Sequence, residues 1–244
     1  MSFIVKQGSF TLNTIKQPIQ LIQYDPDHYS SQLFSTHDIQ QPAQLSQWVT
    51  KRQAQFLAGR IAAKNALQAM LFTGKNNEKP QNIAIGKHRE PLWPANIVGS
   101  ISHNGNISVA TTADIQQNTR GIGLDIQRIF SDEETMKNSH LILSQSDQAL
   151  FQKGVDSFSE NQLAALIFSA KESFFKAIFN QVGEYFDFDA VSVIAINGQA
   201  GELTLVSHTA LGSVIKPGNS FNINFELFTC QQQEHIVAMM HYAA

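Results

Sequence analysis

Apolar residues recur with the period of an α-helix in two long segments of the chain, 48–72 and 160–180. In each segment they form one stripe that can face a core, while polar residues occupy the other side. Short apolar runs with the period of a β-strand flank both segments. We therefore expect strands, a long helix and strands, and then the same order again.

The shorter runs locate the expected strands. They are 97–102 paired with 107–111, then 121–129, 190–196, 202–207, 221–228 and 235–241. We expect only short strands and loops over 1–47, a polar linker over 114–119, and a mixed, partly mobile segment over 131–159. Two close prolines predict a loop without regular structure over 86–94. The order predicts an α+β fold of two similar halves, 1–115 and 116–244, with the active site in the cleft between them.

Composition excludes several classes of protein. Hydrophobic residues make up 43% of the chain, and the net charge of −3 argues against a dedicated nucleic-acid binder. The single cysteine permits neither an internal disulfide nor a cysteine-based zinc site. We find neither a signal peptide nor an apolar stretch near the ~20 residues that a membrane helix needs. We expect a cytoplasmic protein without a membrane span.

The segment 121–127 (GIGLDIQ) combines glycines with one carboxylate. Along a strand, alternation places Gly121, Gly123, Asp125 and Gln127 on one face. The glycines remove bulk beside the carboxylate, which predicts room for a cation or a phosphate. The alternative is an edge strand with a polar outer face.

Two further patterns suit phosphate. Arg52 and Arg60 lie about two helical turns apart, and guanidinium groups bind phosphate with two hydrogen bonds. Ser102 and His103 enter a turn after a strand, where hydroxyl and imidazole groups can meet phosphate oxygens. The alternatives are a solvated helix face and turn capping.

On the second helix, Glu172 and Lys176 are one turn apart on one face. As an isolated feature, this pair is also typical of a solvent-exposed ion pair.

In combination these patterns resemble a known signature. The strand 122–125 (IGLD), followed about forty residues later by 168–176 (FSAKESFFK), resembles the 4'-phosphopantetheinyl transferases. The stretches 52–64, 89–94 and 100–103 are similar to the larger, pseudo-dimeric branch, that of the enterobactin- and surfactin-type enzymes. The resemblance spans roughly residues 50–180. It implies a pseudo-dimer of two α/β halves with coenzyme A in the cleft between them.

The resemblance also implies roles for individual residues. The C-terminal half would hold Mg2+, with Mn2+ as an alternative, through Asp125 and Glu172. Glu172, or a water that it orients, would accept a proton during the reaction. The implied contacts to coenzyme A phosphates are Arg52, Arg60, Arg89 (or its neighbour Lys87), Ser102 and His103 in the N-terminal half, with Lys171 and Lys176 in the other.

Gln127 departs from the family pattern, because many relatives carry a second acid two residues after the strand aspartate. An amide oxygen or a water can take that place, so we expect weaker metal affinity with activity retained.

The implied reaction moves phosphopantetheine from coenzyme A to a serine of an acyl or peptidyl carrier protein and releases 3',5'-ADP. It would serve siderophore, polyketide or nonribosomal peptide synthesis, with 131–159 as the candidate carrier surface. We expect a monomer. The competing hypotheses are a non-catalytic binder of coenzyme A or carrier proteins, and a metal-dependent phosphohydrolase.

Overall fold

The computed structural model describes residues 2–73, 82–155, 157–230 and 232–243. The chain forms two compact units. The N-terminal unit comprises Met1–Thr11 and Gln17–Thr119, and the C-terminal unit comprises Leu12–Lys16 and Arg120–Ala244. No helix in the described part of the chain is long and apolar enough to cross a membrane.

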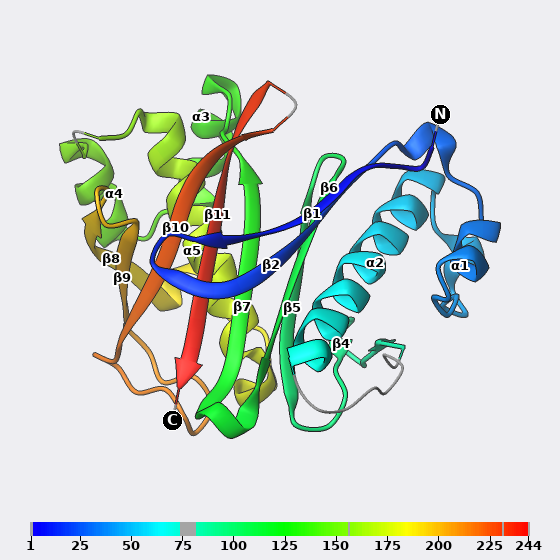
Figure 1. Ribbon diagram of the computed structural model, residues 1–244. Helices are drawn as coiled ribbons and strands as arrows, with labels where there is room; N and C mark the ends of the chain where they lie inside the picture. The colour runs from blue at the N-terminus through cyan, green and yellow to red at the C-terminus, as the bar shows by residue number, and fades with distance from the viewer. Residues whose placement is uncertain (1, 74–81, 156, 231, 244) are drawn as a thin grey trace. The chain divides into compact units, whose positions relative to one another are not determined.

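The N-terminal unit is a four-stranded sheet with one long helix against it (Figure 1). The strand order is β1-β2-β6-β5, with β1 Ile4–Leu12, β2 Ile15–Tyr24, β5 Ile97–Asn104 and β6 Ile107–Asp114. The helix α2, Thr50–Thr73, packs on β5 and β6 through the predicted apolar stripe, in which Leu57 and Ile61 are buried. The predicted helix and the pair β5–β6 are therefore confirmed.

Two expectations for this unit are wrong. Residues 1–47 contain two long strands and the short helices η1 Pro26–His28, α1 Gln32–Thr36 and η2 Leu45–Gln47. The proline-containing loop includes a short antiparallel pair, β3 Ala84–Ile85 with β4 Pro91–Leu92. Proline is tolerated there because so short a pairing leaves its missing N–H outside the ladder. Residues 74–77, where we expected α2 to end, lie outside the described residues.

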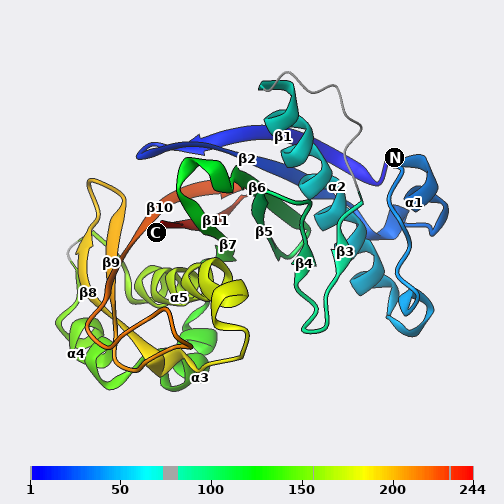
Figure 2. The same ribbon diagram turned by 90° about the horizontal axis from the view of Figure 1, so that it is seen from below.

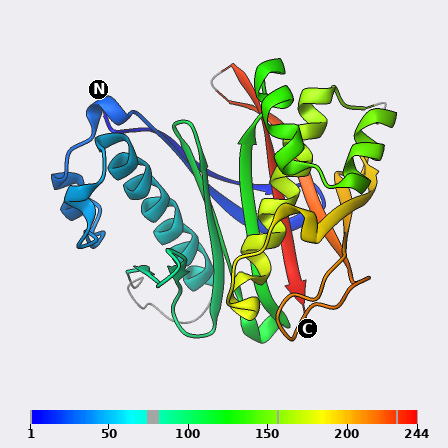
Figure 3. The same ribbon diagram turned by 180° about the vertical axis from the view of Figure 1, so that it is seen from behind.

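The C-terminal unit is a five-stranded sheet in the order β7-β11-β10-β9-β8. Its strands are β7 Thr119–Arg128, β8 Val191–Asn197, β9 Glu202–Ser207, β10 Ser220–Cys230 and β11 Gln233–Ala243. The helix α5, Glu160–Val182, lies along this sheet (Figure 3). All five strands predicted for this unit and the predicted helix are confirmed, with small shifts at most of their ends.

The segment that we expected to be mixed forms two helices, α3 Asp132–Ile142 and α4 Gln145–Lys153. Both begin with a capping box, Ser131 with Glu134 and Ser144 with Asp147, which satisfies backbone donors at the helix start. Both helices pack against α5 (Figure 2). The segment is therefore largely helical and not irregular.

The glycines of β7 allow the backbone of α5 to approach the strand. A Cβ atom on Gly121 would lie 1.8 Å from the carbonyl oxygen of Ala177, and one on Gly123 would lie 1.7 Å from that of Ser173. The space that we assigned to a cation or phosphate beside these glycines is therefore filled by the helix. This close contact brings the next residue on the same strand face, Asp125, against α5.

Candidate functional site

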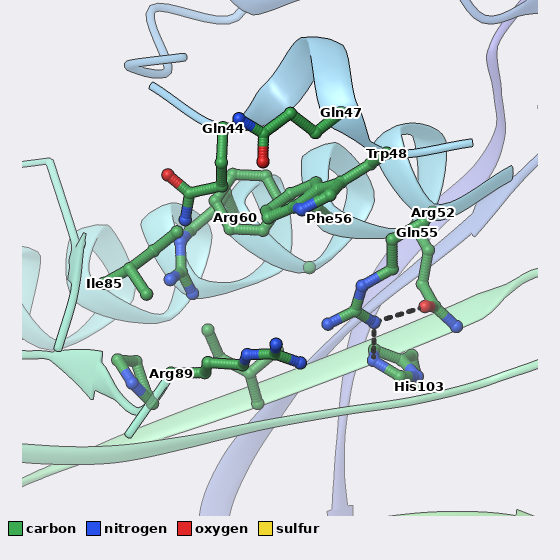
Figure 4. A pocket seen from close by; sticks show the side chains of 13 residues that line it. Gln44, Gln47, Trp48, Arg52, Gln55, Phe56, Arg60, Ile85, Arg89 and His103 are labelled. Carbon is green, nitrogen blue, oxygen red and sulfur yellow. Dashed lines mark hydrogen bonds between the residues drawn. The ribbon is translucent and has the colours of Figure 1, made fainter. Parts of the chain in front are cut away.

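A cavity of about 480 Å³ in the N-terminal unit collects most of the predicted phosphate contacts of that unit (Figure 4). We call it the arginine pocket. Arg52 and Arg60 reach it from α2, Arg89 from the β3–β4 turn and His103 from β5. Its remaining lining residues are Gln44, Gln47, Trp48, Gln55, Phe56, Gly59, Ile85, Pro91 and Ile101.

Arg60 is the most deeply placed charge of the pocket. Its guanidinium lies 4.6 Å from the centre of the Phe56 ring, and the residue is only 7% exposed. Nη2 lies 3.5 Å from the carbonyl oxygen of Ala84, and Nε has no hydrogen-bond partner among the described residues. Burial, helped by the charge of Arg52, lowers the pKa of Arg60 to about 10, so it stays charged at neutral pH. A buried and incompletely bonded guanidinium strongly favours an anionic ligand.

Arg52 and His103 meet at the pocket wall. Nη1 of Arg52 donates to Oε1 of Gln55 at 2.6 Å and lies 3.2 Å from Nε2 of His103. Because a guanidinium can only donate, Nε2 of His103 is the acceptor and this imidazole is neutral in the arrangement. The two predicted residues are thus joined before any ligand binds.

Ser102 does not line the arginine pocket. Side chains alternate along β5, and its neighbours Ile101 and His103 both face the pocket. The Ser102 side chain therefore lies on the opposite face, where the residue is 4% exposed. Of the two residues predicted to contact coenzyme A phosphates here, only His103 lines this pocket, and the contact predicted for Ser102 stays a prediction.

The sequence reasoning missed the aromatic rings and amides of the pocket. The signal was present, since Arg52, Phe56 and Arg60 recur every four residues and so share one helix face. Among the described residues, the lining contains three arginines and no aspartate or glutamate. The pocket is therefore a receptor for anions.

A second site lies in the C-terminal unit, where β7 meets α5. Nζ of Lys176 lies 2.6 Å from Oδ1 of Asp125 and 3.7 Å from Oε2 of Glu172. Ser169 donates its hydroxyl to Oδ2 of Asp125 at 2.9 Å. We call Asp125, Glu172 and Lys176 the acid–lysine site. The structure thus brings together the three residues that we predicted to act in catalysis.

The two carboxylates of this site influence each other. Burial raises the pKa of Glu172, the charge of Lys176 opposes that shift, and the charge of Asp125 adds to it. Asp125 itself is only 4% exposed. A buried acid and a partly exposed acid that repel each other are stabilised by a shared cation, and in this structure that cation is the ammonium group of Lys176.

Gln127 lies on the same face of β7 as Asp125. Its Nε2 donates to the carbonyl oxygen of Arg128 at 2.8 Å, which sets the orientation of the amide. Within the described residues, no three His, Cys, Asp or Glu side chains gather as a metal site. The oxygen atoms of the acid–lysine site are those of the Asp125 and Glu172 carboxylates, with the Ser169 hydroxyl beside Asp125 and Gln127 on the same strand face.

Lys171 occupies a different environment from Lys176. Its buried Nζ donates to Oδ2 of Asp147 at 2.5 Å and to the carbonyl oxygens of Ile142 and Phe188 at 3.0 and 2.8 Å. Burial lowers the pKa of Lys171, and the charge of Asp147 opposes that shift. All three ammonium donors are used inside the unit. The prediction that Lys171 contacts a phosphate is therefore wrong.

An α+β chain with a pocket for anions and a pair of converging carboxylates is typical of enzymes that act on phosphate-bearing substrates. Residues 41–113 match the family model of the 4'-phosphopantetheinyl transferase N-terminal domain. Residues 121–239 match that of the 4'-phosphopantetheinyl transferase superfamily.

Individual relatives agree with these matches. Enterobactin synthase component D of Escherichia coli K12 is 34% identical over 161 residues, which cover 65% of this chain and 69% of the relative. The protein of the same name from Salmonella typhimurium is 36% identical over 132 residues, 54% of this chain and 50% of the relative. The 4'-phosphopantetheinyl transferase Npt of Nocardia iowensis is 28% identical over 145 residues, 59% of this chain and 60% of the relative.

The chain belongs to the 4'-phosphopantetheinyl transferase superfamily. It is a 4'-phosphopantetheinyl transferase, an enzyme that moves phosphopantetheine from coenzyme A to carrier proteins. A solved holo-(acyl-carrier-protein) synthase of Bacillus anthracis covers 51% of this chain and 98% of its own, with 17% identity and a TM-score of 0.35, a likeness too weak to carry an argument. The family, the α+β fold class and the enzyme class predicted from the sequence are confirmed.

Proposed function

We propose that the enzyme binds coenzyme A phosphates in the arginine pocket and Mg2+ at the acid–lysine site. The acceptor is a serine of an acyl or peptidyl carrier domain, and 3',5'-ADP is the leaving group. One observation carries the proposal: Asp125 and Glu172, far apart in the sequence, converge on the ammonium group of Lys176.

The residues of the acid–lysine site fit a divalent cation. Carboxylate and amide oxygens are the ligands that Mg2+ and Mn2+ prefer, and Asp125, Glu172 and Gln127 provide them. The ammonium group between the two carboxylates marks the place where positive charge is stabilised. A bound Mg2+ would offset the negative charge that builds on the pyrophosphate oxygens during transfer.

The arginine pocket supports the assignment of the coenzyme A phosphates to the N-terminal unit. Arg52, Arg60 and Arg89 carry three positive charges, and no acid is present among the lining residues that the structure describes. Nε of Arg60 is buried and has no hydrogen-bond partner within the described part of the chain, so a phosphate oxygen would supply a hydrogen bond there. Guanidinium groups bind phosphate more strongly and more directionally than most other donors.

The transfer requires a proton acceptor for the serine and a hydrogen-bond donor to the substrate phosphate, and residues of the C-terminal unit can supply both. The serine oxygen forms a bond to the phosphorus that bears pantetheine, while the bond from that phosphorus to the ADP oxygen breaks. The serine proton passes to Glu172, or to a water held by it, since a carboxylate can act as a general base. Lys176 can turn from Asp125 to donate to a phosphate oxygen of the substrate.

Mass spectrometry of an apo-carrier domain incubated with the enzyme, coenzyme A and Mg2+ tests the proposal. We expect the carrier to gain one phosphopantetheine group and 3',5'-ADP to appear in equal amount. EDTA should stop the reaction, and added Mg2+ should restore it. A carrier with its serine replaced by alanine is the control.

Three results would contradict parts of the proposal. Full activity in EDTA would exclude the metal site. Release of phosphopantetheine without a carrier would favour a phosphohydrolase, and no modification of several different carriers would favour a non-catalytic binder.

A further inference from the structure

The turn between β3 and β4 carries Arg89 into the arginine pocket. The N–H of Gly86 donates to the carbonyl oxygen of Glu90 at 2.8 Å, and the N–H of Arg89 donates to that of Gly86 at 3.1 Å. Arg89 has a φ of 67°, in the left-handed region that favours glycine and is uncommon for arginine. Some other interaction must hold the turn in this shape.

The carboxylate of Glu90 supplies such an interaction. Its Oε2 accepts a hydrogen bond from the N–H of His88 at 2.7 Å, inside the same turn. It also lies against the backbone of Gly86, since a Cβ atom placed there would be 2.0 Å from Oε1. The side chain thus closes the turn from within, and Glu90 does not itself line the pocket, although Arg89 and Pro91 on either side do.

We propose that Glu90 is a positioning residue for coenzyme A: its carboxylate closes the 86–90 turn, and the closed turn holds the Arg89 guanidinium in the arginine pocket (Figure 4). This inference rests on the proposed function, in which that pocket binds coenzyme A phosphates. Glu90 acts through Arg89 and does not touch the substrate.

The sign of the effect separates this role from simple electrostatics. Glu90 is an acid next to a pocket of arginines, so on charge alone its removal should strengthen anion binding. If the carboxylate positions Arg89, replacement by alanine should instead weaken binding. Glutamine keeps an oxygen that can accept from His88 while it removes the charge, so Glu90→Gln should bind at least as well as the wild type.

Steady-state kinetics of the full chain, with the concentration of coenzyme A varied, provide the test. We expect Glu90→Ala to raise KM for coenzyme A about fivefold with kcat within about twofold, as for the loss of one well-placed charged hydrogen bond. Glu90→Gln should restore the wild-type KM. Asp27→Ala, which removes an exposed acid of the same unit, should have no effect.

Gly86→Ala should open the turn without altering Glu90 itself, because the added methyl group would displace the Glu90 carboxylate. The glycine does not have a positive φ, so its backbone accepts alanine. We expect the same rise in KM as for Glu90→Ala. In an Arg89→Ala background, which should itself raise KM about tenfold, neither change should add a further rise. Should Glu90→Ala fail to fold, Gly86→Ala decides the question.

The outcomes separate this inference from the proposed function. If Arg89→Ala raises KM but Glu90→Ala and Gly86→Ala leave it unchanged or lower it, the role of Glu90 is overturned and the pocket assignment stands. If Arg60→Ala and Arg89→Ala both leave KM unchanged, the pocket assignment itself is wrong, and the role of Glu90 falls with it.

Discussion

The arginine pocket and the acid–lysine site are both built where a long helix lies against strands, yet their charges are balanced differently. Three arginines line the pocket, and none of its described lining residues is an acid. In the acid–lysine site, one ammonium group lies between two carboxylates. The arginine pocket therefore gains a counter-charge when an anion binds. In the acid–lysine site, Lys176 already supplies a positive charge, so a metal ion would have to displace its ammonium group.

The glycines at the two sites explain their different shapes. In the N-terminal unit the glycine is on the helix, where a Cβ atom on Gly59 would lie 3.2 Å from Cγ2 of Ile101. In the C-terminal unit the glycines are on the strand, and Gly123 faces the backbone of α5 directly. Side chains thus separate helix and strand around the pocket, whereas backbone contact at the other site brings carboxylates from two elements together.

The largest effect should come from removing either carboxylate of the acid–lysine site. We expect Asp125→Ala and Glu172→Ala each to lower kcat by about 10²–10⁴-fold, because the proposed metal loses a ligand and, for Glu172, the reaction loses its base. Glu202→Ala, which removes an exposed acid of β9, should leave kcat unchanged. The assay is carrier modification at saturating Mg2+, and wild-type turnover in either variant would remove this site from the mechanism.

The next largest effect should come from replacing the glycines at the two helix–strand contacts. Gly123→Ala should lower the free energy of unfolding by about 3 kcal/mol or more, because its Cβ atom would collide with the backbone of α5. Gly59→Ala should change it by less than about 1 kcal/mol, since the better helix propensity of alanine offsets a tight contact with a side chain. Urea denaturation measures both. Equal losses would mean that the two helix–strand contacts are alike after all.

Arg60→Met tests whether the buried guanidinium of the pocket binds a phosphate of coenzyme A. We expect KM for coenzyme A to rise about tenfold with little change in kcat, because a charged hydrogen bond to phosphate is lost. Stability should stay the same or rise, since a buried guanidinium with an unpaired Nε is replaced by an apolar side chain. Lys51→Ala, an exposed cation on the same helix, is the matched control. A loss of stability with an unchanged KM would make Arg60 a structural residue.

Hydrophobic periodicity predicted the main elements because it reflects local burial. The apolar stripes of α2 and α5 and the alternation of side chains in β7 are each visible within a single segment of sequence. No tertiary contact was needed to predict them. The starts of α3 and α4 were also readable, since Ser131 with Glu134 and Ser144 with Asp147 have capping-box spacing. Those two helices were missed because they are short and mostly polar, with 11 and 9 residues, not because the chain lacks start signals.

Ser102 and Lys171 differ in how far their positions could be read from the sequence. The position of the Ser102 side chain follows from strand alternation alone, which places it on the other face of β5 from the side chain of His103. Lys171 lies four residues after Ile167 and three before Phe174, within the buried face of α5, so its burial was also readable. Its partner was not, because Asp147 reaches it from another helix and only the tertiary structure joins them. The lining of the arginine pocket likewise combines elements that are distant in sequence.

The smallest effect should come from Gln127→Glu, which tests whether the carboxylates of the acid–lysine site are balanced by a divalent cation or by Lys176. A third carboxylate would add attraction for Mg2+, and we expect the concentration for half-maximal rate to fall about fivefold. Without metal it would add repulsion that Lys176 alone offsets, so the melting temperature should drop in EDTA and recover with Mg2+. Gln233→Glu, at an exposed position of β11, should do neither. If the Mg2+ requirement is unchanged or higher, Gln127 is not near the ion. If the melting temperature does not respond to metal, the two carboxylates are balanced by Lys176 and not by a divalent cation.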